Sequence, residues 1–380
     1  MDEARMRELS LPLEIKPFRV RTREAWAAFL AGEGELRTLM EQKDRAAVSE
    51  QLVARCAELL APAFANPAFE LGFNGKKYEL ILSPEGDRTR MFQLAYFQKR
   101  APEELLDRWN ILVGRTRSAR FVLKMFGQEI ALSDVQVWVE KLEGGGVELR
   151  LYCEKLLPIL REDENRAYNM IYILLDQALG ELAAMRYVDG LELLAESRPD
   201  GFIPLNWLAG YLASEVDPEG WEQASNPELA SQRYTAYRGD PVEGGDWTPR
   251  QDVYAGITCC TPLIRCYFQG EDALVDQLHR DGVVAGFFYY PLDGVDKKEV
   301  LDLRDQLEET IEAKAGEDAV LFTGGATGED NGYLDFIAWD LKAVLDAAAE
   351  AFAAVPVAWA GFHTFRLSAR GVALKRSEKS

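Results

Sequence analysis

The chain has 380 residues, of which 48% are apolar and 28% charged; this length predicts two or three domains, and the apolar content excludes an intrinsically disordered chain. No uninterrupted apolar run reaches the roughly 18 residues that a membrane-spanning helix needs, and the charged N-terminus shows no signal peptide. The formal net charge of −20 disfavours direct binding to nucleic acids, because a negative surface repels phosphate groups.

Residues 1–66 are predicted to form a helical lead-in that packs on the next unit. Trp26, Phe29 and Leu30 share one face of a helix, and Asp44 is a suitable N-cap for a second helix.

Residues 67–200 are predicted to form an α+β domain. Residues 69–73 and 77–82 alternate apolar and polar side chains around Asn74-Gly75, which is a strong signal for a β-hairpin. A second hairpin is expected around the three glycines at 144–146. The other expected elements are a helix through Phe92 and Tyr96, strands at 110–114, 134–140, 147–152 and 185–194, and a helix over 164–182 that buries Tyr168, Ile171, Tyr172, Leu175 and Leu179.

Residues 201–250 combine prolines and glycines with many aromatic residues, which predicts an ordered connector packed between the domains. An alternative is that these aromatic side chains form the rim of a ligand-binding site, although buried rings usually serve packing alone. The aromatic residues concerned are Trp207, Trp221, Trp247, Tyr211, Tyr234 and Tyr237.

Residues 251–376 are predicted to form a second α+β domain with the element order β-β-α-β-α-β-β-α-β. This order suits a ferredoxin-like two-layer sandwich with additions. The expected strands are 253–260, 263–268, 283–290, two strands within 319–340, and 357–365, and the expected helices are 271–280, 296–313 and 341–354. The predicted fold class is therefore α+β, with two antiparallel-rich domains and a helical lead-in.

The stretch from Ala319 to Asp340 is predicted to hold two strands joined by a glycine-rich acidic loop at 324–332. The loop does not match a phosphate-binding P-loop, because Glu329 and Asp330 stand where a lysine is needed. A hairpin tip that requires positive φ angles explains its glycines.

Asp335 is the carboxylate of greatest interest, because alternation places it with Tyr333, Ile337 and Trp339 on one apolar face of a strand. We expect Asp335 to pair with Arg366 or to cap a neighbouring helix. Asp340 is predicted to be the N-cap of the following helix.

The sequence contains two histidines. His279 is expected at the C-terminal end of a helix, where a positive charge is favourable, and His363 is expected to face the core or a cleft. No zinc-binding, nucleophile-elbow or dinucleotide motif is present, and the residues after Gly328 could form at most a generic calcium or magnesium site. We therefore expect no metal and no cofactor.

The acidic residues are concentrated in the second half of the chain. Residues 1–150 carry 23 acidic and 23 basic side chains, whereas residues 151–350 carry 39 acidic and 15 basic ones. Charge of this kind commonly serves solubility, and the alternative is a surface for a basic partner protein. The five cysteines, an odd number without CxxC spacing, are typical of reduced thiols in a cytoplasmic protein, and adjacent Cys259 and Cys260 are expected in a buried strand.

Part of the chain resembles a known family. The segments Leu303-Arg-Asp-Gln-Leu-Glu-Glu, Ala319-Val-Leu-Phe-Thr-Gly-Gly-Ala-Thr-Gly, Tyr333-Leu-Asp-Phe-Ile and Phe352-Ala-Ala-Val-Pro carry this resemblance. They resemble an uncharacterised bacterial domain family that often neighbours modules similar to the regulator of ribonuclease activity B. The resemblance covers residues 296–366 and implies a ferredoxin-like fold and protein binding, with no catalytic residues to transfer. The segment 174–181 is similar to domains of unknown function in other bacterial cytosolic proteins.

These observations favour a non-catalytic cytosolic binding or regulatory protein, such as an acidic inhibitor or immunity-type protein that occludes a basic partner. The alternative is a small-molecule enzyme, hydrolase-like, that uses Asp335, Glu329 and His363 beside the glycine-rich loop. Ligand contacts are expected from Gly324, Gly325, Gly328, Glu329, Asp330 and Trp339. The oligomeric state stays open.

Overall fold

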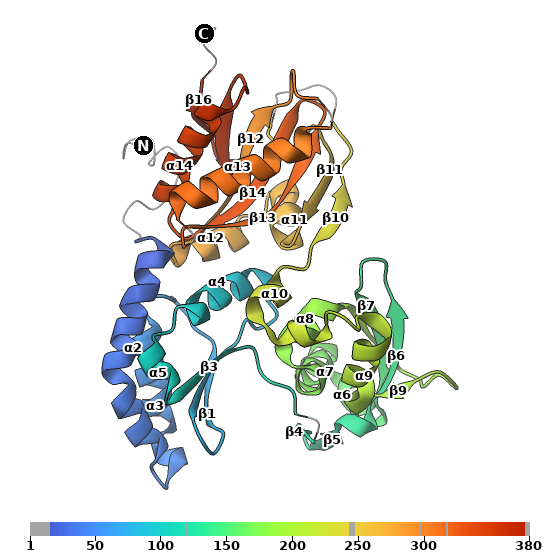
Figure 1. The fold of residues 1–380 in the computed structure, drawn as a ribbon. Coiled ribbons are helices and arrows are strands. Elements are labelled where there is room, and N and C mark those ends of the chain that lie inside the picture. The colour runs from blue at the N-terminus through green and yellow to red at the C-terminus, as the bar shows by residue number, and fades with distance from the viewer. Residues whose placement is uncertain (1–15, 119, 243–247, 297, 317, 377–380) are drawn as a thin grey trace. The chain divides into compact units, whose positions relative to one another are not determined.

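The structure is a computed structural model that describes residues 16–118, 120–242, 248–296, 298–316 and 318–376 (Figure 1). The chain divides into two compact units: unit 1 combines residues 1–67 with 234–380, and unit 2 consists of residues 68–233. This division differs from the predicted boundaries, because the predicted connector is shared between the units and the lead-in groups with the C-terminal residues. No helix of the described ranges has the length and apolar character to cross a membrane.

Unit 1 is built on a seven-stranded sheet in which all neighbouring strands are antiparallel. In sheet order, the strands are β10 (Thr235–Arg238), β11 (Val253–Thr258), β13 (Val320–Gly328), β14 (Asn331–Ala338), β12 (Val284–Pro291), β15 (Ala360–Thr364) and β16 (Val372–Lys375). The described helices of the unit are α2 (Phe18–Met40), α3 (Arg45–Leu60), α11 (Thr261–Gln269), α12 (Ala273–Arg280), α13 (Val300–Ala315) and α14 (Leu341–Ala354).

Helices cover both faces of this sheet. Helices α13 and α14 lie on one face of the sheet (Figure 1). Their apolar stripes pack there, and the rings of Phe288 and Phe336 stack with centroids 4.5 Å apart. The other face carries Phe287 and Tyr333, and Tyr267 of α11 packs edge-on against Phe287 at 5.5 Å. The side chains of β14 therefore alternate between the faces as the sequence predicts, and β12 and β14 are buried along nearly their whole length.

The N-terminal helix α2 is anchored on the end of this sheet. The backbone N–H of Phe18 donates to the Gly282 carbonyl at 3.0 Å, and that of Arg19 donates to the Trp339 carbonyl at 3.0 Å. The Phe18 ring is fully buried, 5.6 Å from the Trp339 ring. The guanidinium of Arg19 pairs with Asp340 at 2.7 Å. Asp340 also accepts a hydrogen bond from the Ala343 N–H, so it is the predicted N-cap of α14.

Unit 2 contains three smaller sheets, with strand orders β1-β2-β3, β4-β5 and β8-β7-β6-β9. Its strands are β1 (Phe69–Phe73), β2 (Tyr78–Leu82), β3 (Trp109–Val113), β4 (Val122–Met125), β5 (Gln128–Ala131), β6 (Gln136–Lys141), β7 (Val147–Tyr152), β8 (Val188–Leu193) and β9 (Ile203–Pro204). Its α-helices are α4 (Arg88–Lys99), α5 (Glu103–Leu106), α6 (Leu157–Glu162), α7 (Glu164–Leu179), α8 (Glu181–Tyr187), α9 (Leu208–Tyr211) and α10 (Pro227–Ser231). Both predicted hairpins are present, and β2–β3 and β7–β8 are parallel pairs joined through helices.

Several predicted elements differ from the structure. Residues 263–268 lie in helix α11 and not in a strand, because Pro262 occupies the first turn, the buried residues follow helical spacing, and Gly270 ends the helix with φ +67°. Tyr172 was expected to be buried but is half-exposed on α7, whose buried stripe passes through Met170, Ile171 and Leu174. The observed architecture is mixed α and β with an N-terminal helical region and antiparallel-rich sheets, as predicted.

The glycine-rich segment is mostly strand, which corrects the predicted loop at 324–332. Strand β13 continues through Gly328, and only residues 329 and 330 form the turn to β14. Gly324 has φ +136° at a register shift, and a Cβ there would overlap the Ile257 carbonyl of β11. A Cβ at Gly328 would overlap the Asp252 carboxylate. These glycines therefore permit close packing of neighbouring groups.

Candidate functional site

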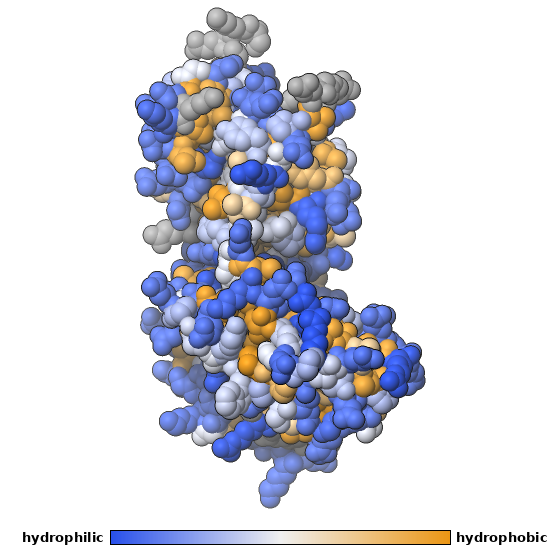
Figure 2. All heavy atoms as spheres, turned by 90° about the vertical axis from the view of Figure 1, so that its right-hand side faces the viewer, coloured by the Kyte–Doolittle hydropathy of each residue, from blue (hydrophilic) through white to orange (hydrophobic). Residues whose placement is uncertain are grey.

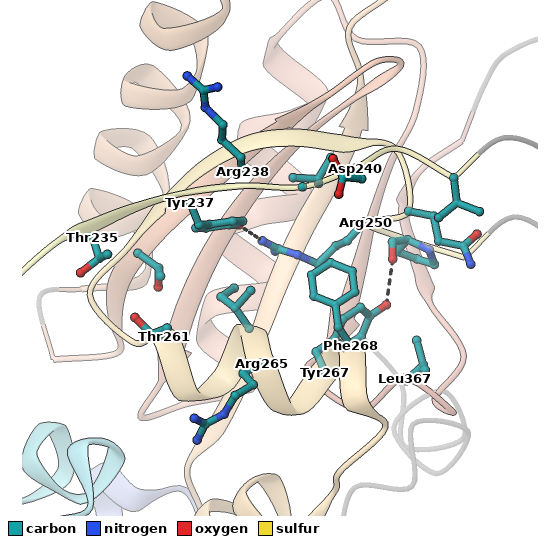
Figure 3. A pocket seen from close by; sticks show the side chains of 17 residues that line it. Thr235, Tyr237, Arg238, Asp240, Arg250, Thr261, Arg265, Tyr267, Phe268 and Leu367 are labelled. Carbon is teal, nitrogen blue, oxygen red and sulfur yellow. Dashed lines mark hydrogen bonds between the residues drawn. The ribbon is translucent and has the colours of Figure 1, made fainter. Parts of the chain in front are cut away.

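A cavity of about 490 Å³ lies in unit 1 between β10, the start of β11 and helix α11 (Figure 3). We call it the Arg250 cavity. Most of the surface of its wall is apolar, although about half of the lining residues are polar or charged. Its lining residues are Thr235, Tyr237, Arg238, Gly239, Asp240, Val242, Pro249, Arg250, Gln251, Val253, Thr258, Thr261, Ile264, Arg265, Tyr267, Phe268 and Leu367. Clefts of several hundred cubic ångströms with this composition are typical of sites for small ligands.

Alternation along the edge strand β10 selects which side chains reach the cavity. Thr235 pairs with Thr258, and Tyr237 pairs with Gly256. The ring of Tyr237 lies directly over Gly256, where a Cβ would overlap it. A glycine at this position therefore lets the ring lie flat against the sheet. In Figure 3 the side chain of Arg238 leaves from the other side of β10 and points away from the cavity.

Helix α11 forms the opposite wall. Ile264 and Phe268 are four residues apart and so lie on the same side of the helix. Tyr267 is buried, and its hydroxyl donates to the Pro249 carbonyl at 3.0 Å, which ties the helix to the loop before β11 (Figure 3). The side chain of Arg265 points down from the helix, away from the cavity.

Arg250 forms the inner wall and is fully buried. Its Nη1 donates to Asp335 Oδ1 at 2.5 Å, and its Nη2 donates to Asp335 Oδ2 at 3.3 Å and to the Tyr237 hydroxyl at 2.5 Å. The guanidinium lies 5.0 Å from the ring centroid of Phe287 and 5.3 Å from that of Tyr333. Burial lowers the pKa of Arg250, but Asp335, Tyr237 and Tyr333 together more than offset this and raise the pKa overall. The side chain is therefore a fixed, permanently charged group.

A second buried network holds the backbone of Arg250. This residue has φ +75°, an uncommon angle for a residue other than glycine. Its N–H donates to the Tyr333 hydroxyl at 2.9 Å, and that hydroxyl donates to Asp252. Asp252 also accepts from the backbone and side-chain nitrogens of Asn331 at 3.0 Å each. The β13–β14 turn thus holds Arg250 in place, and a strained backbone held by its surroundings is common at binding sites.

The structure does not bring the predicted catalytic residues together. Asp335 is buried beneath the cavity in the ion pair with Arg250, so the predicted pairing with Arg366 is wrong; Arg366 pairs with Asp272 at 2.7 Å. Glu329 is exposed at the β13–β14 turn. None of Asp335, Glu329 and His363 is among the side chains that line the cavity.

The two histidines are buried. His363 Nδ1 lies 2.6 Å from the Thr364 carbonyl and Nε2 lies 3.0 Å from the Ala369 carbonyl, so both ring nitrogens contact backbone oxygens. His363 therefore faces the core, which is one of the two predicted positions. His279 lies near the end of α12 as expected, but burial and nearby Arg366 lower its pKa to about 4, so it is neutral at pH 7 and does not supply the expected positive charge.

The predicted ligand-contact residues serve other roles. Trp339 is buried under helix α2. Gly324, Gly325 and Gly328 lie in strand β13, and Asp330 contributes a backbone N–H to Asp252. Within the described ranges, no group of three or more His, Cys, Asp or Glu side chains is arranged to hold a metal ion.

The thiols offer no nucleophile for the cavity. All five cysteines are buried and none forms a disulfide, and burial raises the pKa of Cys259 to about 12. Strand β11 ends at Thr258, so Cys259 and Cys260 are buried as predicted but lie between β11 and α11 and not in a strand. A buried thiol with a raised pKa is chemically inert at neutral pH.

The predicted aromatic rim is divided between the units. In unit 2, Trp207, Tyr211 and Trp221 line a separate cavity of about 560 Å³, and Trp207 is 67% exposed. In unit 1, Tyr237 lines the Arg250 cavity, and Tyr234 precedes β10 without lining it. Trp247 lies outside the described residues.

Comparisons with known protein families, with curated proteins and with solved structures yield no match to this chain. The resemblance of residues 296–366 to a bacterial family thus stays a prediction, and the function must be inferred from the geometry.

Arg250, Tyr267 and Phe268 are site residues that were not predicted from the sequence. The predicted strand at 263–268 hid the helical spacing that brings Ile264 and Phe268 to one wall. The sequence around Arg250 indicates a buried site residue only weakly, because Arg250 follows Pro249 in a polar stretch and its partner Asp335 is distant in sequence.

Proposed function

We propose that the protein is a non-catalytic binding protein and that unit 1 holds a small, mainly apolar ligand in the Arg250 cavity. The observation that carries this proposal is the combination of an apolar wall with a buried, immobilised guanidinium in a cavity of about 490 Å³. Ligand sites commonly join a predominantly apolar lining to a few fixed polar groups that orient the ligand. Unit 1 would then report or control the presence of that ligand.

An enzymatic role, the alternative drawn from the sequence, has weaker support. General acid–base catalysis requires titratable groups within hydrogen-bonding reach of a shared pocket. The residues assigned to this role, Asp335, Glu329 and His363, lie in an ion pair, at an exposed turn and against backbone carbonyls. Of the cavity's own titratable groups, Tyr237 has a pKa that burial raises to about 12, so it holds its proton at neutral pH.

A pair of substitutions on strand β10 tests the ligand-binding proposal. Thr235→Trp places a large side chain in the cavity, whereas Ala236→Trp places the same group on the opposite face of the same strand. The uncharged fluorescent probe N-phenyl-1-naphthylamine should bind the unaltered protein and the Ala236→Trp variant saturably. We expect Thr235→Trp to weaken this binding by at least about tenfold.

Two results would contradict the proposal. The first is an absence of saturable probe binding to the unaltered protein. The second is equal affinity for the two tryptophan variants, which would place the probe elsewhere. Thermal unfolding of both variants controls for loss of structure.

A second candidate function is docking on a basic partner protein, as an inhibitor or immunity-type protein would do. The observation that favours it is helix α13, which carries a row of exposed acidic residues without ion pairs among the described residues. They are Asp302, Asp305, Glu309 and Glu312. The acidic side chains of α13 are close enough to affect one another. At half-buried Glu308, burial and the neighbouring Asp305 raise the pKa of the carboxyl to about 7. Complementary charge speeds encounter with a basic surface.

The acidic stretch at 151–350 is divided between the units, and the larger part of its excess negative charge lies in unit 1. The docking function is therefore assigned to unit 1. Residues 151–233 of unit 2 carry 15 acidic and 6 basic side chains, and residues 234–350 of unit 1 carry 24 and 9. A basic partner recovered in pull-downs by the unaltered protein at low salt should be lost at high salt. It should also be lost when the four α13 acids are replaced by Asn or Gln. Neutralising Glu103, Glu104, Asp107 and Glu143 in unit 2 is the matched control. Recovery of a salt-indifferent partner by both variants would refute this candidate.

We also propose a ferredoxin-like core for unit 1 and a cytoplasmic location. The first is supported by the segment from β12 to β15, where two β-α-β connections through α13 and α14 give the strand order β13-β14-β12-β15. The second is supported by five cysteines, none of which forms a disulfide.

A further inference from the structure

Two hydrogen-bond donors at the inner wall of the Arg250 cavity have no acceptor in the described part of the chain. The Nε of Arg250 is buried and has no hydrogen-bond partner there. The Tyr237 hydroxyl accepts from Arg250 Nη2, and no acceptor for its own proton is present among the described residues (Figure 3). A buried donor without an acceptor is unfavourable, and native proteins leave few of them. The Tyr237 hydroxyl lies 2.5 Å from Nη2 of the same guanidinium that carries Nε, which makes this part of the wall a place for an oxygen atom supplied from outside the protein.

The charges around these donors decide what kind of oxygen fits. The single positive charge of Arg250 is already matched by Asp335, whose two carboxylate oxygens take both Nη groups. Exposed Asp240 adds a further negative charge to the lining, and Arg238 and Arg265 point away from the cavity (Figure 3). A carboxylate placed on Arg250 Nε would be close to the Asp335 carboxylate in a medium of low polarity, and like charges repel strongly there. An uncharged acceptor avoids this repulsion.

The remainder of the wall defines the body of the ligand. Ile264, Tyr267 and Phe268 present apolar surface from α11, with Val242 and Leu367 beside them. The side of the molecule that carries β10 shows apolar side chains in separate patches between hydrophilic ones (Figure 2). A flat aromatic or compact aliphatic body suits the space between the Tyr237 and Phe268 rings, because aromatic side chains favour stacked or edge-on contacts.

We infer that the Arg250 cavity selects apolar molecules that carry an uncharged hydrogen-bond acceptor, such as a ketone, ester or amide carbonyl, whose oxygen accepts from the Tyr237 hydroxyl and Arg250 Nε. This inference rests on the proposed ligand-binding function and specifies its ligand class. It assigns Tyr237 and Arg250 as the residues that determine specificity, and α11 as the element that binds the body.

A matched set of naphthalene probes tests the inference. The ketone 6-propionyl-2-(dimethylamino)naphthalene, the corresponding 6-carboxylate and the unsubstituted 2-(dimethylamino)naphthalene share one apolar body and differ only in the head group. At pH 7 we expect the ketone to bind roughly tenfold more tightly than either of the others, since one hydrogen bond to a charged donor is worth about a factor of ten or more. The dissociation constants can be measured by fluorescence titration.

Substitution of Tyr237 locates the head group. Tyr237→Phe should weaken binding of the ketone about tenfold and leave the unsubstituted naphthalene unchanged, because only the ketone uses the hydroxyl. Tyr254→Phe is the matched control, since Tyr254 lies on β11 outside the lining and is half-exposed. Because Tyr237→Phe also removes a partner of Arg250, its melting temperature is measured. The unsubstituted naphthalene then serves as an internal standard for an intact cavity.

The possible outcomes separate the two proposals. If none of the naphthalenes binds, and N-phenyl-1-naphthylamine does not bind either, ligand binding in the cavity is wrong. If all three bind with similar affinity and Tyr237→Phe affects them equally, the cavity binds apolar ligands but the head-group inference is overturned. Tighter binding of the carboxylate than of the ketone would also overturn it, because the charge argument would then fail.

Discussion

Replacing Asp335 with leucine leaves the Arg250 guanidinium buried and without its counter-ion. Both side chains of the pair are fully buried, and among the described residues the guanidinium keeps the Tyr237 hydroxyl as its one hydrogen-bond partner. Removing one member of a buried ion pair costs about 3–5 kcal/mol, because the remaining charge stays in a medium of low polarity. We expect Asp335→Leu to lose stability in this range.

The double variant Arg250→Met/Asp335→Leu provides the comparison. Apolar replacement of both members of a buried pair is often neutral or stabilising, so the double variant should be more stable than Asp335→Leu by at least about 2 kcal/mol. Since the protein has two units, one global transition does not describe its unfolding. Urea titration should therefore be followed by hydrogen exchange in β14 of unit 1, with β7 of unit 2 as the internal control.

The reasoning is refuted if Asp335→Leu costs less than about 1 kcal/mol in β14, or if the double variant is no more stable than this single variant. Equal losses in β14 and β7 would also count against it, because the ion pair belongs to unit 1 alone.

Three other predictions concern stability. His279 has a pKa of about 4 in the folded protein and about 6.5 when unfolded, so the unfolded state binds more protons at this residue between these pH values. Its own contribution is a loss of about 3 kcal/mol on acidification from pH 7 to 4, whereas the raised pKa of Glu308 acts in the opposite sense, so the contribution is measured as the difference in urea unfolding between the unaltered protein and His279→Leu. Gly324→Ala should cost about 2 kcal/mol or more and increase hydrogen exchange in β11 and β13, whereas Gly210→Ala, which meets open space on α9, should be neutral or slightly stabilising. Phe18→Ala should cost about 3–5 kcal/mol and increase exchange in α2, and protection equal to that of the unaltered protein would show that the Phe18–Trp339 contact does not hold the helix.

Local sequence patterns predicted the elements that depend on local interactions. The Asn74-Gly75 hairpin, the N-caps Asp44 and Asp340 and the faces of β14 are all set by residues within a few positions of each other. Period and capping therefore identify them from a single sequence. The error at 263–268 has the same origin, because a short apolar run of this length fits a strand or a helix equally well.

The candidate site could not be predicted in the same way, because tertiary contacts create it. Arg250 and Asp335 are 85 positions apart, and Tyr237 reaches the guanidinium only because β10 pairs with β11 over Gly256. Asp335 was identified as an unusual carboxylate in an apolar strand, but nothing near it in sequence indicated its partner. Asp335 shows that a charged residue on a predicted apolar face is a useful signal of a site, even when the sequence does not reveal its partner.

The division of unit 1 into two chain segments has a consequence for biosynthesis. The helices α2 and α3 leave the ribosome before unit 2, yet the sheet that buries Phe18 is encoded after residue 233. Roughly 300 residues separate the end of α3 from the end of β15, so at about 5–20 residues per second the nascent helices precede that sheet by about fifteen to sixty seconds. Unit 2 is continuous and can fold meanwhile, so the exposed apolar stripe of α2 is where a chaperone would act during translation.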